Sequence, residues 1–301
     1  MMAAIKSLQT ALRGIRTNPV LFLGGLILGL VVLPQTAAQL AQIPLLPLAL
    51  QALTFFITPF IIAGIYGMAD EAVESDTSRT SLSTLTDVGR EKYVPLLLAN
   101  VVELGITLPF VIIFIFLAIA GVFTLGISAA ATGSGLALNG GVIVLLLFAG
   151  LLVLAYIIIM FFIQFFPVAV VVNDAGAIES FQQSYRFVWS NIVPTLGYSV
   201  IQVVAGIITA LPVLGFVFFR TIQDFQTIQS TGGAATAGMP AGMGFSAVEI
   251  AAITLLSLAM QMLLTAFKTT YAVAFFEEHQ SSPAEPTGPD IDGDSVIPQF
   301  E

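Results

Sequence analysis

Two oppositely charged side chains, Glu103 and Lys268, lie inside long apolar stretches of this 301-residue sequence. Ionisable groups in such surroundings are costly and are therefore candidates for function. At ~1.5 Å of rise per helical residue, each charge lies roughly 12–14 Å from the end of its stretch that adjoins the more basic connectors. Because opposite charges at matched depth attract, we expect Glu103 and Lys268 to form a pair.

Uncharged polar residues extend this expected pair into a buried polar layer. Gln164 and Gln202 fall at a similar depth in two other apolar stretches, and Asn100 lies one helical turn nearer the surface. Such a layer suits a proton or ion relay or a substrate contact. The alternative is a structural role, because polar side chains between membrane helices commonly fix their register.

Composition excludes most catalytic chemistry. The chain has no cysteine, so disulfides, thiolate nucleophiles and cysteine-based metal sites are excluded. His279 is the only histidine, whereas metal catalysis uses clusters of histidines and carboxylates. The sequence contains no HExxH, GxSxG or Walker motif. We therefore expect a protein that is not an enzyme and that holds no metal and no cofactor.

Hydrophobic content indicates a membrane protein. The chain is 57% hydrophobic and 9% charged, whereas soluble domains carry about 25% charged residues. Its mean hydropathy is +0.99, and runs of about 20 apolar residues are long enough to cross a bilayer. We predict an all-α polytopic bundle with six spans, at about 19–35, 48–68, 94–126, 140–172, 192–219 and 247–276.

Basic residues predict the orientation of these spans. Seven lysines and arginines lie in the N-terminal segment and in two alternate connectors, and only Arg220 lies in the connectors of the opposite side. Because positive residues favour the cytoplasmic side, we expect both termini in the cytoplasm and the protein in the cell membrane. The seven residues are Lys6, Arg13, Arg16, Arg79, Arg90, Lys92 and Arg186.

The charge balance is acidic. Nine basic residues face 18 acidic ones, giving a net charge of −9, and only three of the basic residues are lysine. Salt screens the self-repulsion of such a surface, so the balance is typical of a high-salt cytoplasm. The sequence has no basic patch, and we therefore expect no nucleic-acid partner.

Two stretches of the chain, residues 4–24 and 177–197, are similar in sequence. Each joins an amphipathic segment to an apolar run, which predicts an interfacial helix before a span. Arg13, Arg186 and Trp189 in these segments are candidates for contact with lipid head groups. Nine of the 21 aligned positions are identical: Ala4/Ala177, Ile5/Ile178, Ser7/Ser180, Gln9/Gln182, Arg13/Arg186, Asn18/Asn191, Val20/Val193, Leu23/Leu196 and Gly24/Gly197.

A weaker match at 81–100 suggests a third copy of the unit. We predict one transmembrane domain over residues 1–278, with repeat units at about 4–70, 80–174 and 177–278. Residues 279–301 are predicted to form a disordered acidic cytoplasmic tail. Gly25 and Gly29 in the first span favour close helix packing or dimerisation.

The amphipathic segments also resemble a known kind of membrane domain. The positions of Ser7, Arg13 and Asn18, repeated as Ser180, Arg186 and Asn191, are similar to those in membrane domains found beside glycerophosphodiester phosphodiesterases. They also resemble uncharacterised multi-pass families of haloarchaea. Because the catalytic phosphodiesterase domain is absent from this sequence, the resemblance implies a fold and not an enzyme.

Together these features predict a non-catalytic integral membrane protein with a structural, regulatory or accessory role. A small-solute transporter that uses the buried polar layer is the alternative. A lipid-binding or lipid-processing protein is the third. The expected partners are the lipid bilayer, anionic lipid head groups and a homo- or hetero-oligomer.

Overall fold

The computed structural model describes residues 2–74, 79–132, 140–230 and 245–280. Over these residues the chain is almost entirely helical and has no strand. The described helices are α1 (Met2–Thr17), α2 (Leu21–Leu40), α3 (Leu46–Glu74), α4 (Leu82–Thr132), α5 (Gly140–Ile163), α6 (Phe166–Val172), α7 (Ala177–Ser190), α8 (Ile192–Ser230) and α9 (Ala247–Gln280).

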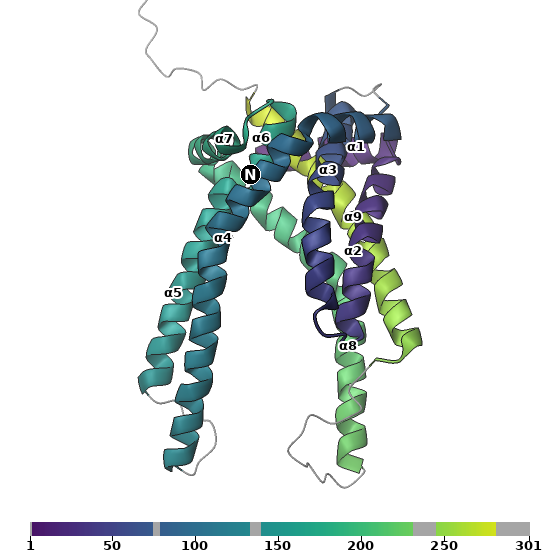
Figure 1. Cartoon of the computed structure of the whole chain (residues 1–301). Helices are drawn as coiled ribbons and strands as arrows, with labels where there is room; N and C mark the ends of the chain where they lie inside the picture. The colour runs from purple at the N-terminus through teal and green to yellow at the C-terminus, as the bar shows by residue number, and fades with distance from the viewer. Residues whose placement is uncertain (1, 75–78, 133–139, 231–244, 281–301) are drawn as a thin grey trace, which may run out of the picture.

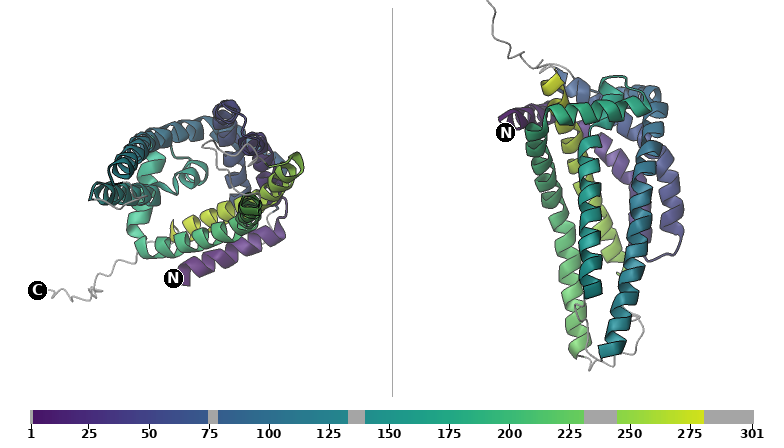
Figure 2. Two further views of the ribbon diagram at one scale, coloured as in Figure 1. Left: turned by 90° about the horizontal axis from the view of Figure 1, so that it is seen from below. Right: turned by 90° about the vertical axis from the view of Figure 1, so that its left-hand side faces the viewer.

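Two arms of helices diverge from a shared end of the molecule (Figure 1). One arm is the α4–α5 hairpin, and the other holds α2, α3, α9 and the distal part of α8. The short helices α1 and α7 lie across the shared end, at a steep angle to the arms (Figure 2). We call this the closed end, which comprises α1, α6, α7 and the C-terminal third of α9.

Six helical stretches are long and apolar enough to cross a membrane, as predicted. They are Leu21–Leu40, Leu46–Glu74, Leu82–Thr124, Gly140–Val172, Ile192–Arg220 and Ala247–Gln280. The number of these stretches is even. At the closed end, an ion pair between Lys6 and Glu278 joins the first helix to the last described helix.

The core of the closed end is built around α9. From Thr265 to Phe276 this helix is buried almost without interruption. Aromatic rings pack around it: the Tyr198 ring centroid lies 4.7 Å from that of Tyr271 and 4.8 Å from that of Phe275. Phe165, between α5 and α6, is fully buried against the same group. Large rings in offset contact supply most of the packing energy of such a core.

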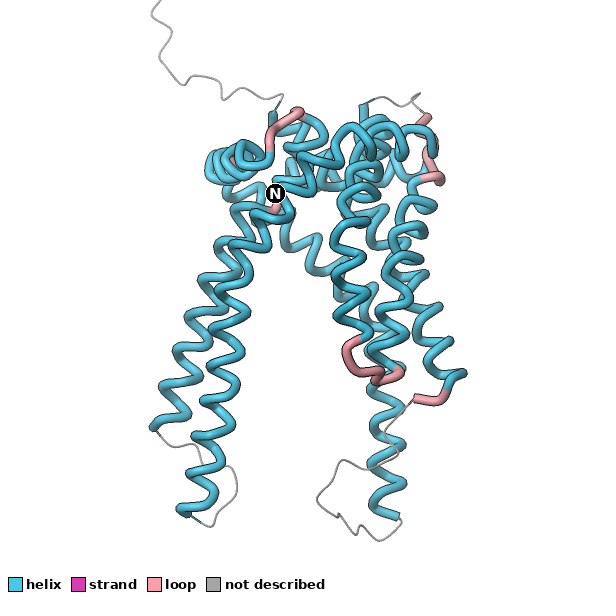
Figure 3. Tube along the Cα trace, viewed as in Figure 1, coloured by secondary structure: helices cyan, strands magenta, loops and turns pink. Residues whose placement is uncertain are grey.

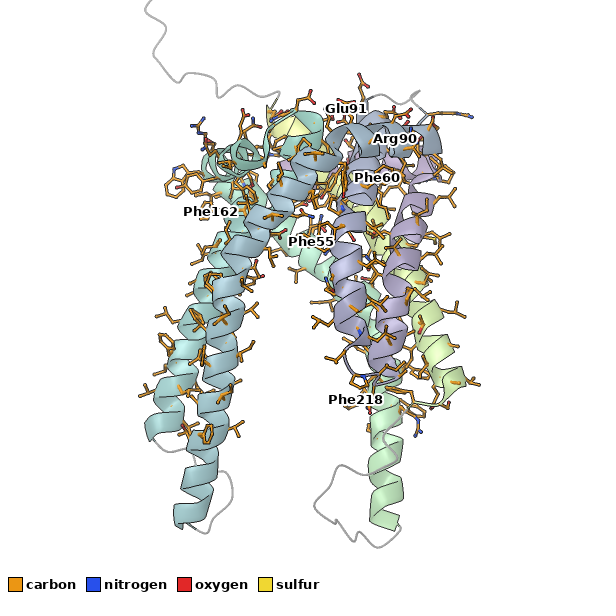
Figure 4. All side chains as sticks on the ribbon, viewed as in Figure 1. Phe55, Phe60, Arg90, Glu91, Phe162 and Phe218 are labelled. Atoms are coloured by element: carbon orange, nitrogen blue, oxygen red, sulfur yellow. The ribbon has the colours of Figure 1, made fainter. Side chains whose placement is uncertain are left out.

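The α4–α5 arm and the distal part of α8, in contrast, expose most of their apolar side chains. In the spans formed by α4 and α8, none of the most apolar 18-residue window is buried inside the protein. Figure 4 shows this difference, with Arg90 and Glu91 at the closed end and Phe218 far along α8. Helices that are apolar on all sides and unpacked are suited to contact with hydrocarbon, where all backbone polar groups are satisfied within the helix.

The two glycines of the first span pack within the chain. A Cβ atom at Gly25 would lie 2.6 Å from the carbonyl oxygen of Met262 in α9, and one at Gly29 would lie 2.6 Å from Leu258. Small residues let helix backbones approach closely. Of the two expectations for this motif, close packing is therefore the one that the structure shows.

Helix boundaries differ from the sequence-based prediction in two places (Figure 3). The segment before Pro95, expected to be a separate interfacial helix, is continuous with the third span in α4. The predicted fourth span breaks between Ile163 and Phe166, just before Pro167, which has no N–H to continue the hydrogen-bond ladder. The predicted tail lies, beyond Gln280, outside the described residues.

Candidate functional site

Glu103 and Lys268, the predicted charge pair, do not form an ion pair with each other or with any other described residue. Lys268 is exposed, and Glu103 is half-buried on α4 near Tyr66 of α3. Similar depth along two spans does not fix the direction in which each helix points its side chains. α4 packs against α3, α5, α6 and α7, whereas α9 packs mainly against α1, α2, α3 and α8.

Each glutamine of the predicted layer is hydrogen-bonded to a neighbouring helix: Gln164 to α8, and Gln202 of α8 to α9. Gln202 Nε2 donates to the Tyr198 hydroxyl at 2.8 Å and to the backbone carbonyl of Lys268 at 3.3 Å. Ser199 Oγ donates to Gln164 Oε1 at 3.3 Å. These bonds tie neighbouring helices through side-chain amides, which is the structural role considered above.

Asn100 stays apart from this group. It is half-buried on α4 and makes no hydrogen bond within the described ranges. The predicted layer is therefore divided into a hydrogen-bonded part, Gln164 and Gln202, and two isolated residues of α4, Asn100 and Glu103. Nothing in this arrangement places a nucleophile beside a base.

Ser184 is a polar residue that sequence reasoning missed. Its hydroxyl donates to the carbonyl oxygen of Phe162 at 2.8 Å and accepts from the backbone N–H of Phe165 at 3.1 Å. Both backbone groups flank the break between α5 and α6, and Ser184 is fully buried. The proline just after the break was a signal that backbone groups there would need an outside partner.

A second unpredicted polar group fastens α1 to α9. Ser7 Oγ donates to Glu278 Oε2 at 2.5 Å, and Lys6 Nζ lies 2.9 Å from Glu278 Oε1. The Tyr271 hydroxyl donates to the carbonyl oxygen of Ala4 at 3.0 Å. These contacts join residues more than 260 positions apart, and no local pattern marks such partners.

The predicted head-group residues lie in separate places. Arg13 lies on an open face of α1 with Gln9 and Arg16. Arg186 lines a different hollow at the C-terminal end of α7. Trp189 is 59% exposed, and its ring centroid lies 5.9 Å from that of Tyr185 and 5.9 Å from that of Phe162.

Asn18 and Asn191 follow the ends of α1 and α7 and make the same bonds there. Asn18 donates from its backbone N–H to the carbonyl of Gly14 at 2.9 Å and from Nδ2 at 3.3 Å. Asn191 does the same to Phe187, at 3.1 and 3.0 Å. Asn18 Oδ1 also accepts from the backbone N–H of Thr80 at 3.1 Å, which fixes the approach to α4.

Among the described residues, no group of three or more histidine, aspartate or glutamate side chains is arranged to hold a metal ion. The polar groups that the structure brings together thus serve helix junctions: α1 to α9, α7 to the α5–α6 break, and α8 to α9.

Comparisons with known proteins identify a family but no activity. Neither the curated proteins nor the solved structures contain a match to this chain. One family model does match it, over residues 2–279, which is nearly its whole length. The chain belongs to the family described as Domain of unknown function (DUF7847).

Proposed function

We propose that this chain is a non-catalytic integral membrane protein with a structural or accessory role in the cell membrane. The observation that carries the proposal is the filled interior of the closed end. Tyr198, Tyr271, Phe165 and Phe275 pack there, and the distances between contacting ring centroids run from 4.7 to 6.5 Å. All four rings are buried, and a filled core of this kind supports a scaffold over a carrier.

The proposed topology places the closed end in the cytoplasm and both termini with it. The excess of basic residues at this end supports that side. The alignment of 4–24 with 177–197 supports two repeat units of equal orientation, with 80–174 between them as a third. The acidic, lysine-poor composition supports a haloarchaeal source. An accessory role beside a glycerophosphodiester phosphodiesterase rests on the sequence resemblance alone.

A flux measurement tests the scaffold role. The purified full-length protein is reconstituted into proteoliposomes that contain a pH-sensitive dye, and a proton gradient is applied with and without sodium or potassium gradients. We expect dissipation at the rate of protein-free liposomes, and no change in the Glu103→Gln variant. A protein-dependent flux that Glu103→Gln abolishes contradicts the scaffold proposal.

A small-solute transporter is the second candidate, and one observation favours it. Glu103 is a carboxyl within a candidate span that no described cation neutralises, and such groups mark proton and ion pathways in transporters. The same experiment separates the two candidates, because only a transporter requires the Glu103 carboxyl for flux.

A further inference from the structure

A polar hollow of about 360 Å³ lies at the closed end where three elements meet. Its walls come from the C-terminal half of α7, the residues after α6 and the last turn of α9. The lining side chains are Asn173, Gln183, Arg186, Ser190, Asn191 and His279. Phe187 forms the floor, with its ring centroid 4.7 Å from that of Phe276 in the core and 6.3 Å from that of His279.

Arg186 supplies the positive charge of this hollow. Its side chain is exposed and has no ion-pair or hydrogen-bond partner in the described parts of the chain. The nearby carboxylates are engaged elsewhere: Glu179 with Gln183, Asp174 with Lys92, and Glu278 with Lys6 and Ser7. The guanidinium is therefore available to an external anion.

Capping at the C-terminus of α7 lowers the cost of an anion in the hollow. The C-terminus of a helix carries partial negative charge on its free carbonyls, which would repel an anion. Two of these carbonyls in α7 already accept hydrogen bonds. The Asn191 backbone N–H donates to Phe187 and Val188, and Asn191 Nδ2 donates to Phe187.

Donors remain after these bonds are made. Asn191 Nδ2 has two N–H groups and uses one on Phe187. The Ser190 hydroxyl has no hydrogen-bond partner among the described residues. His279 is not one of these donors, because its Nδ1 faces the Phe275 carbonyl and must carry the proton, which leaves Nε2 of the neutral ring as an acceptor. One guanidinium fork flanked by an amide and a hydroxyl matches the oxygens of a phosphate group.

The surroundings place this hollow at the level of lipid head groups. Tyr185 and Trp189, on either side of Arg186 in α7, are 47% and 59% exposed and stack on each other. Exposed amphipathic rings of this kind lie at the membrane–water interface. A phosphate group reaches that level either as part of a lipid or as a free ion.

We propose that this hollow binds one phosphate oxyanion through Arg186, with Ser190 and Asn191 as additional donors. The site does not depend on the scaffold role, since the absence of phosphate binding would leave the flux result unchanged. Arg90, an exposed arginine of α4 that lines none of the hollows described above, provides the control.

Trp189 offers a direct readout because it is the only tryptophan of the chain and lies one turn from Arg186. The full-length protein in uncharged detergent is titrated with inorganic phosphate, with short-chain phosphatidylglycerol, and with a diacylglycerol of the same chain length. We expect a saturable change in Trp189 emission with a phosphate-bearing ligand and none with diacylglycerol. Saturation by inorganic phosphate identifies a free-ion site, and saturation by phosphatidylglycerol alone identifies a head-group site.

Variants decide whether Arg186 carries the binding. Loss of a charge-assisted hydrogen bond weakens affinity by about tenfold or more, so Arg186→Gln should raise the dissociation constant by at least that factor. The dissociation constant of Arg186→Lys should lie between those of Arg186→Gln and the unmodified protein. Arg90→Gln should change the dissociation constant less than about twofold. Equal affinity in Arg186→Gln, equal losses in both arginine variants, or an equal response to diacylglycerol would each overturn the proposal.

Discussion

At the aligned positions 14 and 187, α1 has glycine and α7 has phenylalanine, and this difference decides how each helix is attached. Gly14 lets α1 approach α3 so closely that a Cβ atom would lie 3.0 Å from the carbonyl oxygen of Ala72. Phe187 instead fills the space between α7 and the aromatic core, with its ring centroid 5.0 Å from that of Phe165. One helix is held by backbone proximity and the other by a large ring.

The polar attachments differ in the same way. α1 is fastened to α9 by Ser7, Lys6 and the carbonyl of Ala4. At the position of Ser7, α7 has Ser180, which is equally buried but donates only to the carbonyl of Ala177 in its own helix. Asn18 and Asn191, in contrast, make the same hydrogen bonds to the last turns of their helices. Similar sequence thus produces the same local helix and the same exit turn, while the contacts to the rest of the bundle follow from the residues that differ.

The largest expected effect on stability comes from removing the aromatic ring of Phe187. Phe187→Ala should lower the free energy of unfolding by about 3–4 kcal/mol, because a buried aromatic side chain is lost and a cavity remains. Unfolding by SDS in mixed micelles, followed by the helical circular dichroism signal, measures this change. Phe219→Ala on the exposed part of α8 is the control and should stay within about 0.5 kcal/mol.

Introducing a side chain at Gly14 should have the next largest effect on stability. Gly14→Leu should cost about 2–3 kcal/mol, because the added side chain meets backbone atoms of α3 that cannot move aside. Gly105→Leu is the matched control, since a Cβ atom there has no neighbour within 4 Å. Equal costs for the two variants in the same SDS titration would show that α1 does not need this close approach.

Replacing each of the two asparagines by alanine should lower the free energy of unfolding by different amounts. Asn18→Ala should cost about 2 kcal/mol, since it also leaves the buried N–H of Thr80 without its acceptor. Asn191→Ala removes only the bond to its own helix and should cost about 1 kcal/mol or less. The reverse order would contradict the role given to Thr80.

The smallest expected effect concerns the helix break. Ser184→Ala leaves the N–H of Phe165 unpaired and should cost about 1–1.5 kcal/mol, whereas Ser180→Ala should cost about 0.5 kcal/mol or less. Hydrogen exchange at Phe165, measured by mass spectrometry, adds a local readout. It should quicken in Ser184→Ala alone, and unchanged exchange would contradict the account of the break.

Sequence reasoning could predict the parts of this fold that follow from local chemistry. The six apolar stretches and the two amphipathic helices that precede spans both depend on neighbouring residues in the chain. The glycines of the first span likewise predicted close packing. Their partner, α9, was not predictable, because shape complementarity between distant helices leaves no periodic signal.

The candidate site shows where this reasoning ends. Depth along a span can be estimated from the sequence, but the partners of Gln164 and Gln202 on neighbouring helices cannot. Rotation about the helix axis is not readable in helices that are apolar on all sides, and this is why Glu103 and Lys268 remain apart. The partners of Ser184 and Glu278 depend on tertiary contacts that only the folded chain reveals.

Single cysteines test the central claim, that the closed end lies on one side of a membrane crossed an even number of times. The natural sequence has no cysteine, so one introduced at Gln9, Gln182 or Leu45, all exposed, reports without background. With a membrane-impermeant maleimide, Leu45→Cys should react in intact cells, and the aligned variants Gln9→Cys and Gln182→Cys should react only after lysis. Reaction of Gln9→Cys and Gln182→Cys from opposite sides would contradict the account.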